Sequence, residues 1–425
     1  MLTTVMEKEL FKTIIRRNQS LLQKVRLHQR DIFFEPNGNY VLVGVRHGGK
    51  SYMLYQRALQ LLEEGVELHR IVFVNFDDER LFEMSAQDFD LIIQVYESMY
   101  VDEPIFFFDE IQNIKGWEHF ARRLANEKYR VFITGSNAKM LSRDVATVLG
   151  ERYLTRLVFP YSFKEFLLAK GVERQQYWMY GPQRGEIERH FNEYFEFGGF
   201  PETLAYIDKR KWLNSLFERI FFSDMVVRNK VRNEEAVRMT VKRLAENVKQ
   251  PTSYNRIANL IKSTGYSVTV TSISDYVRYM QDACFLFSIE NYRSKFVEKE
   301  TVKKHYFVDN GLLNIFLLNA EASLLENICA IHLYRKFEKN LYYFKMNEEV
   351  DFYIPSAGLG VQVAYSLRDE ETRERELKGL KILNEKHPLK RMMIITRDEK
   401  DEIMLNPETK IEVVPVWQWL LEDDD

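Results

Sequence analysis

The chain has 425 residues, of which 45% are hydrophobic and 29% charged, and its formal net charge is −3. This composition predicts about two to four globular domains and excludes a largely disordered or collagen-like chain and a general polycation. Two cysteines exclude a disulfide framework and are typical of a reducing compartment, so we expect a cytoplasmic protein. We find no secretory signal and no apolar run of about 18 residues, so we expect no membrane partner.

The chain begins with helical periodicity that continues to about residue 30. Five short apolar runs follow and alternate with amphipathic stretches, at 40–44, 70–76, 104–110, 129–136 and 152–159. Near-continuous apolar strands separated by helices predict an α/β core with a parallel sheet that is covered on both faces. After Pro160 the pattern becomes mostly helical, and strands return from about residue 300.

The strongest motif has the pattern G-x-x-x-x-G-K-[ST], between a predicted strand and a predicted helix. Its glycines let backbone N–H groups face phosphates, Lys50 places a charge on the β- and γ-phosphates, and Ser51 offers a hydroxyl to Mg²⁺. We therefore predict a site for ATP and Mg²⁺. Its expected contact residues are Gly44, Val45, Arg46, His47, Gly48, Gly49, Lys50, Ser51 and Tyr52.

Two later strands end in polar side chains. The third apolar run ends in Asp109, predicted to hold Mg²⁺ with Ser51, and Glu110, predicted to polarise the attacking water. The alternative is a strand that merely ends in solvent-facing acids. The fourth run ends in Ser136 and Asn137, which either orient the water and contact the γ-phosphate or cap the next helix.

Several segments carry a family resemblance: the phosphate loop, FFFDEIQNIKGWEHF, ITGSNAKMLS and GGFPE, followed by YFVDNGLLN, LLEN, EVDFYI and VQVAYS. Together they resemble prokaryotic AAA-type P-loop ATPases with a C-terminal DUF4143 region. Under this resemblance Asn137 matches sensor 1, and Arg152 falls where an arginine finger often lies, acting in its own chain or in a neighbour's. His47 departs from the pattern, because many relatives carry a second arginine there.

The resemblance also implies an order of domains. This order is an N-terminal helical segment (1–35), a P-loop ATPase core of the AAA+ type (36–159), a helical lid (160–235), a winged-helix module (236–310) and a domain similar to PD-(D/E)XK nucleases (311–425).

Residues 253–283 have helix-turn-helix spacing around a turn at Gly265, with Thr271 or Ser272 as the expected cap of the second helix. Ser274 and Arg278 are candidates to face DNA, and a basic stretch before them offers backbone contacts. A module used only for protein contacts is the alternative, because the second helix holds a single arginine. The expected core is Ile257, Leu260, Ile261, Ile273, Val277 and Met280.

The nuclease-like part has Asp351 and Glu326 at two acidic positions of such enzymes. The next strand carries Gln362 and Ala364 where a carboxylate and a lysine are needed, so we predict a degenerate module without cleavage activity. Lys345 and Lys378 are the candidates to replace the missing lysine in space.

The first hypothesis is an ATP-hydrolysing switch that couples its nucleotide state to a C-terminal region that binds DNA or protein. In it Lys50, Glu110, Asn137 and Arg152 form the catalytic set. One alternative is a nucleotide-gated binding protein with negligible hydrolysis, and another is an ATP-dependent nuclease. A homo-oligomer is required if Arg152 acts across a subunit boundary.

Overall fold

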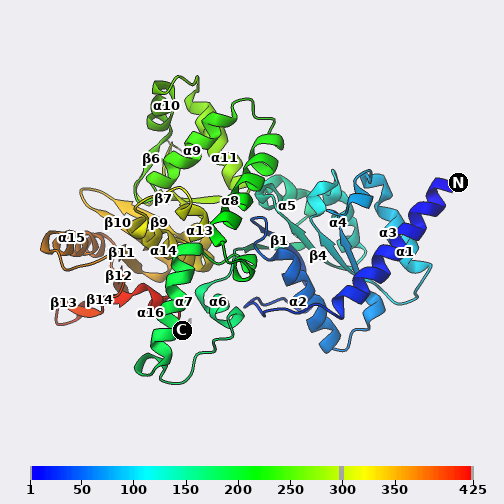
Figure 1. Cartoon of the computed structure of the whole chain (residues 1–425), viewed down its shortest axis with the longest axis horizontal. Helices are drawn as coiled ribbons and strands as arrows, with labels where there is room; N and C mark the ends of the chain where they lie inside the picture. The colour runs from blue at the N-terminus through cyan, green and yellow to red at the C-terminus, as the bar shows by residue number, and fades with distance from the viewer. Residues whose placement is uncertain (1, 296–300, 423–425) are drawn as a thin grey trace. The chain divides into compact units, whose positions relative to one another are not determined.

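The computed structural model describes residues 2–295 and 301–422 of the chain (Figure 1). The chain divides into two compact units, Met1–Val158 and Phe159–Asp425. The predicted end of the ATPase core at residue 159 therefore lies next to this division, and the further subdivision of the second unit stays a prediction. Within the described residues, no helix has both the length and the apolar character needed to cross a membrane.

The first unit, over residues 2–158, contains one sheet of five parallel strands in the order β2-β3-β4-β1-β5. Its strands are β1 (Asn39–Gly44), β2 (Ile71–Asn75), β3 (Ile105–Asp109), β4 (Arg130–Gly135) and β5 (Tyr153–Val158). The first four are almost wholly buried, as expected for a parallel sheet between helices. Because β4 lies between β1 and β3, the carboxyl ends of these three strands meet at one edge of the sheet.

Helices cover both faces of this sheet, which confirms the predicted architecture. They are α1 (Leu2–Leu22), α2 (Lys50–Glu63), α3 (Phe89–Glu97), α4 (Trp117–Asn126) and α5 (Arg143–Leu149). On one face Phe107 shares a buried cluster with Leu54 of α2 and stacks on Phe132, with ring centroids 4.9 Å apart. On the other face Phe108 packs against Phe120 of α4.

The N-terminal helix is shorter than its periodicity predicts. It ends at Leu22, and no helix or strand follows before β1. The helix packs against β2 and α3 (Figure 1), and Asn18 Nδ2 donates a 2.8 Å hydrogen bond to the carbonyl of Phe73. The prediction of a helix to about residue 30 is wrong because the backbone of Arg30 pairs instead with the side-chain amide of Gln56, through two 2.9 Å hydrogen bonds.

The second unit, over residues 159–295 and 301–422, contains a nine-stranded sheet in the order β13-β14-β12-β11-β10-β9-β7-β8-β6. Its strands are β6 (Thr252–Ser253), β7 (Leu286–Asn291), β8 (Val302–Phe307), β9 (Tyr342–Lys345), β10 (Glu349–Ile354), β11 (Leu359–Val363), β12 (Arg391–Thr396), β13 (Asp401–Asn406) and β14 (Thr409–Pro415). The antiparallel pair β7 and β8 joins the later strands because β7 pairs in parallel with β9. The segments predicted as winged-helix and nuclease-like modules therefore share one sheet.

The helices of the second unit include one π-helix, Ile220–Val227, that directly continues α8. The α-helices are α6 (Phe163–Ala169), α7 (Gln183–Phe197), α8 (Lys209–Arg219), α9 (Glu234–Glu246), α10 (Tyr254–Ser263), α11 (Val270–Asp282), α13 (Asn310–Asn314), α14 (Glu321–Phe337), α15 (Glu370–Lys386) and α16 (Val416–Trp419). In this unit α9, α10 and α11 precede the β7–β8 hairpin along the chain.

Three sequence signatures of the second unit meet in its core. The backbone N–H of Gly199 donates a 2.7 Å hydrogen bond to the buried carboxylate of Asp309. Gly198 has φ +73°, and a Cβ there would lie 1.9 Å from the same carboxylate. Asn327 donates a 3.0 Å hydrogen bond to Asn310, the residue after the aspartate. Hydrogen bonds among GGFPE, VDNG and LLEN therefore hold three segments together. Burial raises the pKa of Asp309 to about 6.

Candidate nucleotide site

The phosphate loop connects the end of β1 to the start of α2. Gly44 lies so close to β5 that a Cβ there would be 2.0 Å from the carbonyl oxygen of Val158, which only glycine permits. Gly49 has a left-handed φ of +93° and precedes α2 without a side-chain cap. The first N–H groups of the helix are therefore left to bind an acceptor such as a phosphate.

Lys50 is buried at the start of α2. Its Nζ donates a 3.1 Å hydrogen bond to the carbonyl of Val45 in the loop and lies 3.4 Å from Glu110 Oε1. Its side chain is only 3% exposed. A charge held this close to the loop is placed to contact a bound phosphate.

Asp109 ends β3 beside Ser51 and Thr134. Thr134 Oγ1 donates a 2.5 Å hydrogen bond to its carboxylate, and the Ser51 hydroxyl also hydrogen-bonds to it. Burial and the neighbouring Glu110 raise the pKa of Asp109 to about 6. A cation at this point would compensate the buried charge, and a carboxylate with a hydroxyl is the hard oxygen donor set that Mg²⁺ prefers. The residues present therefore fit Mg²⁺.

Glu110, the residue that follows β3, has a left-handed backbone conformation with φ +52°. Gln112 Nε2 donates a 2.5 Å hydrogen bond to its carboxylate, and Ser136 also hydrogen-bonds to it. Burial opposes the charged form, but the Lys50 ammonium and these hydrogen bonds outweigh it and lower the pKa of Glu110 to about 2. The carboxylate is therefore ionised and oriented, as a group that polarises water must be.

The end of β4 lies between the phosphate loop and the acids, as the strand order requires. Ser136 is fully buried and contacts Gln112 at 3.3 Å. Asn137 Oδ1 accepts a 3.0 Å hydrogen bond from the N–H of Lys139 and so caps the following turn. Asn137 Oδ1 therefore acts as a cap, as one of the two alternatives from the sequence expects. A role of Asn137 toward the γ-phosphate stays a prediction.

Arg152 lies at the opposite edge of the sheet. It immediately precedes β5, and its Nη1 donates a 3.0 Å hydrogen bond to the carbonyl of Gly150. The six residues of β5 span about 20 Å between the two edges. Arg152 therefore does not reach the phosphate loop of its own chain. Its role as an arginine finger toward a neighbouring chain stays a prediction.

Three residues of the site were missed from sequence. Thr134 also accepts a 3.0 Å hydrogen bond from the backbone N–H of Glu110, so it positions both acids. Gln112 orients Glu110, and Arg30 donates a 3.0 Å hydrogen bond to the carbonyl of Gly48 in the loop. The only local signals for the first two were that Thr134 precedes a glycine-serine pair and that Gln112 follows Glu110 by two residues. Arg30 comes from an irregular segment with no motif.

Two proteins are similar to this chain over nearly its whole length. The uncharacterized protein MJ1544 of Methanocaldococcus jannaschii is 32% identical over 98% of this chain and 96% of its own. An uncharacterized protein of Haemophilus influenzae is 30% identical over 97% of this chain and all of its own. This chain belongs to their family.

Two family models match parts of this family member. Residues 37–167 match the family described as AAA domain, and residues 188–324 match a domain of unknown function, DUF8612. The expected DUF4143 match is therefore replaced by DUF8612. The Walker-type ATPase PABY2304 of Pyrococcus abyssi has 14% identity and a TM-score of 0.41, over 71% of this chain and 95% of its own.

The helix-turn-helix segment of this family member forms α10 and α11, but two predictions about it are wrong. The second helix is capped by Thr269, whose hydroxyl accepts a 3.0 Å hydrogen bond from Ser272 N, because the helix begins earlier than expected at Val270. Leu260 is 40% exposed rather than buried, whereas the other five expected core residues are buried. Arg278 is exposed as predicted.

The acids predicted for a nuclease-like site do lie together, around Lys304 of β8. Its buried ammonium is 3.0 Å from Glu326, 2.9 Å from Asp351 and 2.8 Å from Glu349. It therefore occupies the position that a cation would take between these acids. The candidates Lys345 and Lys378 instead pair with Glu349 and Glu348, so the lysine beside Asp351 is Lys304.

Gln362 takes a structural place beside the same acids. Its Oε1 accepts a 2.8 Å hydrogen bond from the N–H of Asp351, and its Nε2 donates one of 2.7 Å to Glu376 of α15. Both polar atoms of the Gln362 amide are therefore engaged in hydrogen bonds within the protein. This supports the expectation of a module without cleavage chemistry.

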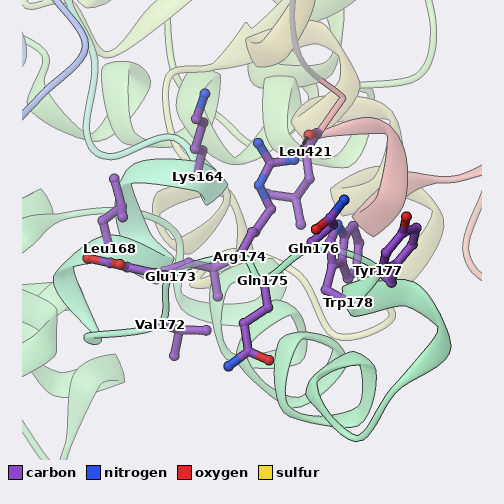
Figure 2. Close-up of a pocket in the computed structure, with 11 residues that line it drawn as sticks. Lys164, Leu168, Val172, Glu173, Arg174, Gln175, Gln176, Tyr177, Trp178 and Leu421 are labelled. Atoms are coloured by element: carbon purple, nitrogen blue, oxygen red, sulfur yellow. Dashed lines mark hydrogen bonds between the residues drawn. The ribbon is translucent and has the colours of Figure 1, made fainter.

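A cavity of about 450 Å³ in the second unit lies beside α6 and the loop that follows it (Figure 2). In Figure 2 the side chain of Arg174 reaches toward Leu421, whose carbonyl accepts its hydrogen bond. The charged residues of the lining are Lys164, Glu173 and Arg174. This cavity is distinct from the phosphate loop, which belongs to the first unit.

Proposed function

We propose that this protein is an ATP-hydrolysing switch. One observation carries the proposal: the carboxyl edge of the first sheet brings Lys50, Asp109 and Glu110 together, each in a different electrostatic setting. The ammonium of Lys50 faces the loop, and Asp109 lies beside the hydroxyl of Ser51. Glu110 is held in its ionised form. Phosphoryl transfer from ATP to water needs these three functions.

In the proposed reaction the loop amides and Lys50 bind the β- and γ-phosphates. Ser51 and Asp109 would hold Mg²⁺, which neutralises phosphate charge when bound. Thr134 keeps the Asp109 carboxylate in place by a hydrogen bond that needs no movement during the reaction. The contribution of these groups is positioning and electrostatic stabilisation.

Glu110 is the proposed group that orients the attacking water and accepts its proton. Gln112 and Ser136 fix its carboxylate. Lys50 is a shared partner, because its ammonium faces both the loop and Glu110. A phosphate that draws Lys50 toward the loop leaves Glu110 with less counter-charge, and its basicity rises when nucleotide is bound.

The proposed coupling to the second unit begins at the junction of the chain. Gly44 pairs in register with Val158, the last residue of the first unit, and the chain continues from there into the second unit. A change in the phosphate loop is therefore adjacent in space to the residue that leads into the second unit. This supports transmission of the nucleotide state through the end of β5.

We propose that the second unit acts on a protein partner through the α9–α11 segment, for which a winged-helix module is our interpretation. The basic residues expected to contact DNA are Arg278 and the preceding Lys230, Arg232, Arg238, Lys242 and Arg243. Three of them are engaged with carboxylates: Arg238 with Glu218 at 2.6 Å, Arg243 with Glu246 at 2.8 Å and Arg278 with Asp275 at 2.7 Å. Arginines paired in this way release few counterions on binding a nucleic acid. DNA binding is the alternative outcome of the experiment.

The test is steady-state ATP turnover with Mg²⁺, measured with and without single-stranded, duplex and branched DNA. The Glu110→Gln variant is the control for contaminating ATPases. We expect turnover that depends on Glu110 and is indifferent to each DNA. Turnover equal in both proteins would overturn the ATPase proposal, and stimulation by DNA would replace the protein partner by DNA.

A further inference from the structure

A second cavity, of about 450 Å³, lies at the amino edge of the sheet in the first unit. Its walls come from residues at or just before the starts of the strands: Arg70, Glu103, Arg130, Asn39 and Arg152, with Lys128 from the turn that precedes β4. The phosphate loop lies at the other edge, about 20 Å away along a six-residue strand. This cavity is therefore separate from the nucleotide site.

The strand order places the arginines of this cavity in a row. Arg70 precedes β2, Arg130 begins β4 and Arg152 precedes β5. In the order β2-β3-β4-β1-β5, each is two strands from the next, which corresponds to about 10 Å. Three guanidinium groups are therefore spread along one edge with Arg130 in the middle.

The charges in this row are poorly neutralised. Arg70 Nε donates to the carbonyl of Glu103 at 2.9 Å, and Arg152 donates to the carbonyl of Gly150. A carbonyl accepts a hydrogen bond but carries no net charge. In the described part of the chain, Glu103 is the one carboxylate among the lining residues, against Lys128 and the three arginines.

Arg130 stands out because its Nε and Nη2 are buried and have no hydrogen-bond partner among the described residues. Its guanidinium lies over the ring of Phe132, 5.7 Å from the centroid. Glu64, the nearby carboxylate, is engaged with Arg57 at 2.8 Å. Burial lowers the pKa of Arg130, and the charges of Arg57 and Arg70 lower it further. Buried donors need a hydrogen-bond acceptor, and an anionic acceptor would also compensate the charge of the guanidinium.

We propose that this cavity is a second anion site, which binds a ligand with a diphosphate group. Arg130 would bind one phosphate with its two free donors, and Arg70 or Arg152 would bind the other. A diphosphate supplies several negative charges and accepts paired hydrogen bonds from guanidinium groups, whereas a single carboxylate leaves most of the row unneutralised. The ligand is free diphosphate or the diphosphate of a nucleotide, and this site does not depend on the proposed ATPase activity.

The test uses the full chain with Lys50→Ala, so that the phosphate loop contributes little, and isothermal titration with inorganic pyrophosphate and with ADP. We expect binding of pyrophosphate that falls at least about tenfold on adding Arg130→Gln, the loss expected for a charged hydrogen bond. Arg122→Gln, an exposed arginine of α4 outside the cavity, is the matched control and is expected to change nothing.

Each outcome decides the proposal. Equal affinities for pyrophosphate and ADP assign recognition to the diphosphate alone, and tighter ADP binding that also requires Arg130 adds the nucleoside. No binding of either ligand, or equal effects of Arg130→Gln and Arg122→Gln, overturns the site. Because Arg130→Gln can disturb folding, Arg70→Gln is measured in parallel, and circular dichroism verifies that each variant is folded. A loss with Arg70→Gln, or with Arg152→Gln measured in the same way, in a folded protein supports the site, and unchanged binding in both variants contradicts it.

Discussion

The Lys50 ammonium lies 3.4 Å from Glu110 Oε1, with 3% of the lysine and 17% of the glutamate side chain exposed. The cation that faces the phosphate loop is therefore also the counter-charge of the group proposed to polarise water. A phosphate at the loop competes with Glu110 for this cation. Nucleotide binding and the basicity of Glu110 are linked through one side chain.

Replacement of Lys50 by alanine removes the charge that contacts phosphate. We expect ATP affinity to fall about 10- to 100-fold, because a hydrogen bond to a charged group contributes about 1.5–3 kcal/mol. Isothermal titration with ATP and Mg²⁺ measures this loss. Lys115→Ala, which removes an exposed lysine of the same unit, serves as control, and equal affinities in the two variants would refute the role of Lys50.

Replacement of Glu110 by glutamine removes the proton acceptor and the competitor for Lys50. We expect turnover to fall at least about 100-fold, the usual effect of losing a general base, with ATP bound at least as tightly as in the wild type. Gln112→Ala removes one of the two side-chain hydrogen bonds that fix the carboxylate and leaves the one with Ser136, so it is expected to lower kcat by about tenfold with KM unchanged. Steady-state kinetics beside Glu127→Gln, an exposed glutamate, tests both, and full turnover in Glu110→Gln contradicts the assignment.

Replacement of Gly198 by alanine forces a Cβ into the Asp309 carboxylate. Gly198 has φ +73° and ψ −162°, a region open essentially to glycine alone. We expect the free energy of unfolding to fall by about 3 kcal/mol or more. Gly171→Ala has a similar φ of +76° but open space, so it is expected to cost only about 1 kcal/mol. Urea unfolding compares the two, and equal losses would show that the contact with Asp309 is unimportant.

Replacement of Lys304 by methionine leaves Glu326, Asp351 and Glu349 without their shared ammonium. We expect a loss of about 3–5 kcal/mol in the free energy of unfolding, as for other buried ion pairs that lose one partner. Lys345→Met removes an exposed partner of the same Glu349 and is expected to cost about 0–1 kcal/mol. Thermal and urea unfolding measure both, and similar stabilities of the two variants would contradict the central place of Lys304.

Asp309 predicts a pH dependence of stability. Its pKa is raised by burial to about 6 in the folded chain, so the folded state binds its proton more tightly than the unfolded state. The unfolding free energy therefore rises as pH falls from about 7 toward 4, with a slope of at most about 1.4 kcal/mol per pH unit from this group. This contribution is complete below the unfolded pKa and is lost as pH rises through 6.

Urea unfolding followed by tryptophan fluorescence tests this dependence, because four of the five tryptophans lie in the second unit. Glu326 and Glu376, with pKa values raised by burial to about 7 and 6, act in the same direction. Asp309→Asn is therefore expected to reduce the slope without abolishing it. An unchanged slope in this variant would show that Asp309 does not titrate as inferred.

The sequence by itself determined the elements whose signal is local. The apolar runs predicted the five strands of the first sheet, and the phosphate loop predicted the turn between β1 and α2. Apolar periodicity was less reliable at ends, as α1 and the cap at Thr269 show, because hydrogen bonds of individual side chains decide where a helix begins or ends.

Only the tertiary structure decided which distant side chains meet. Thr134 reaches Asp109 from a strand 25 residues later, and Lys304 contacts Glu326 and Asp351 across 22 and 47 residues. The motif pattern left open whether Arg152 acts in its own chain or in a neighbour's. The fold puts it at the edge opposite the phosphate loop, because parallel strands have their starts and ends at opposite edges of the sheet. Local patterns specify the elements, whereas strand order and packing determine the partners of each charge.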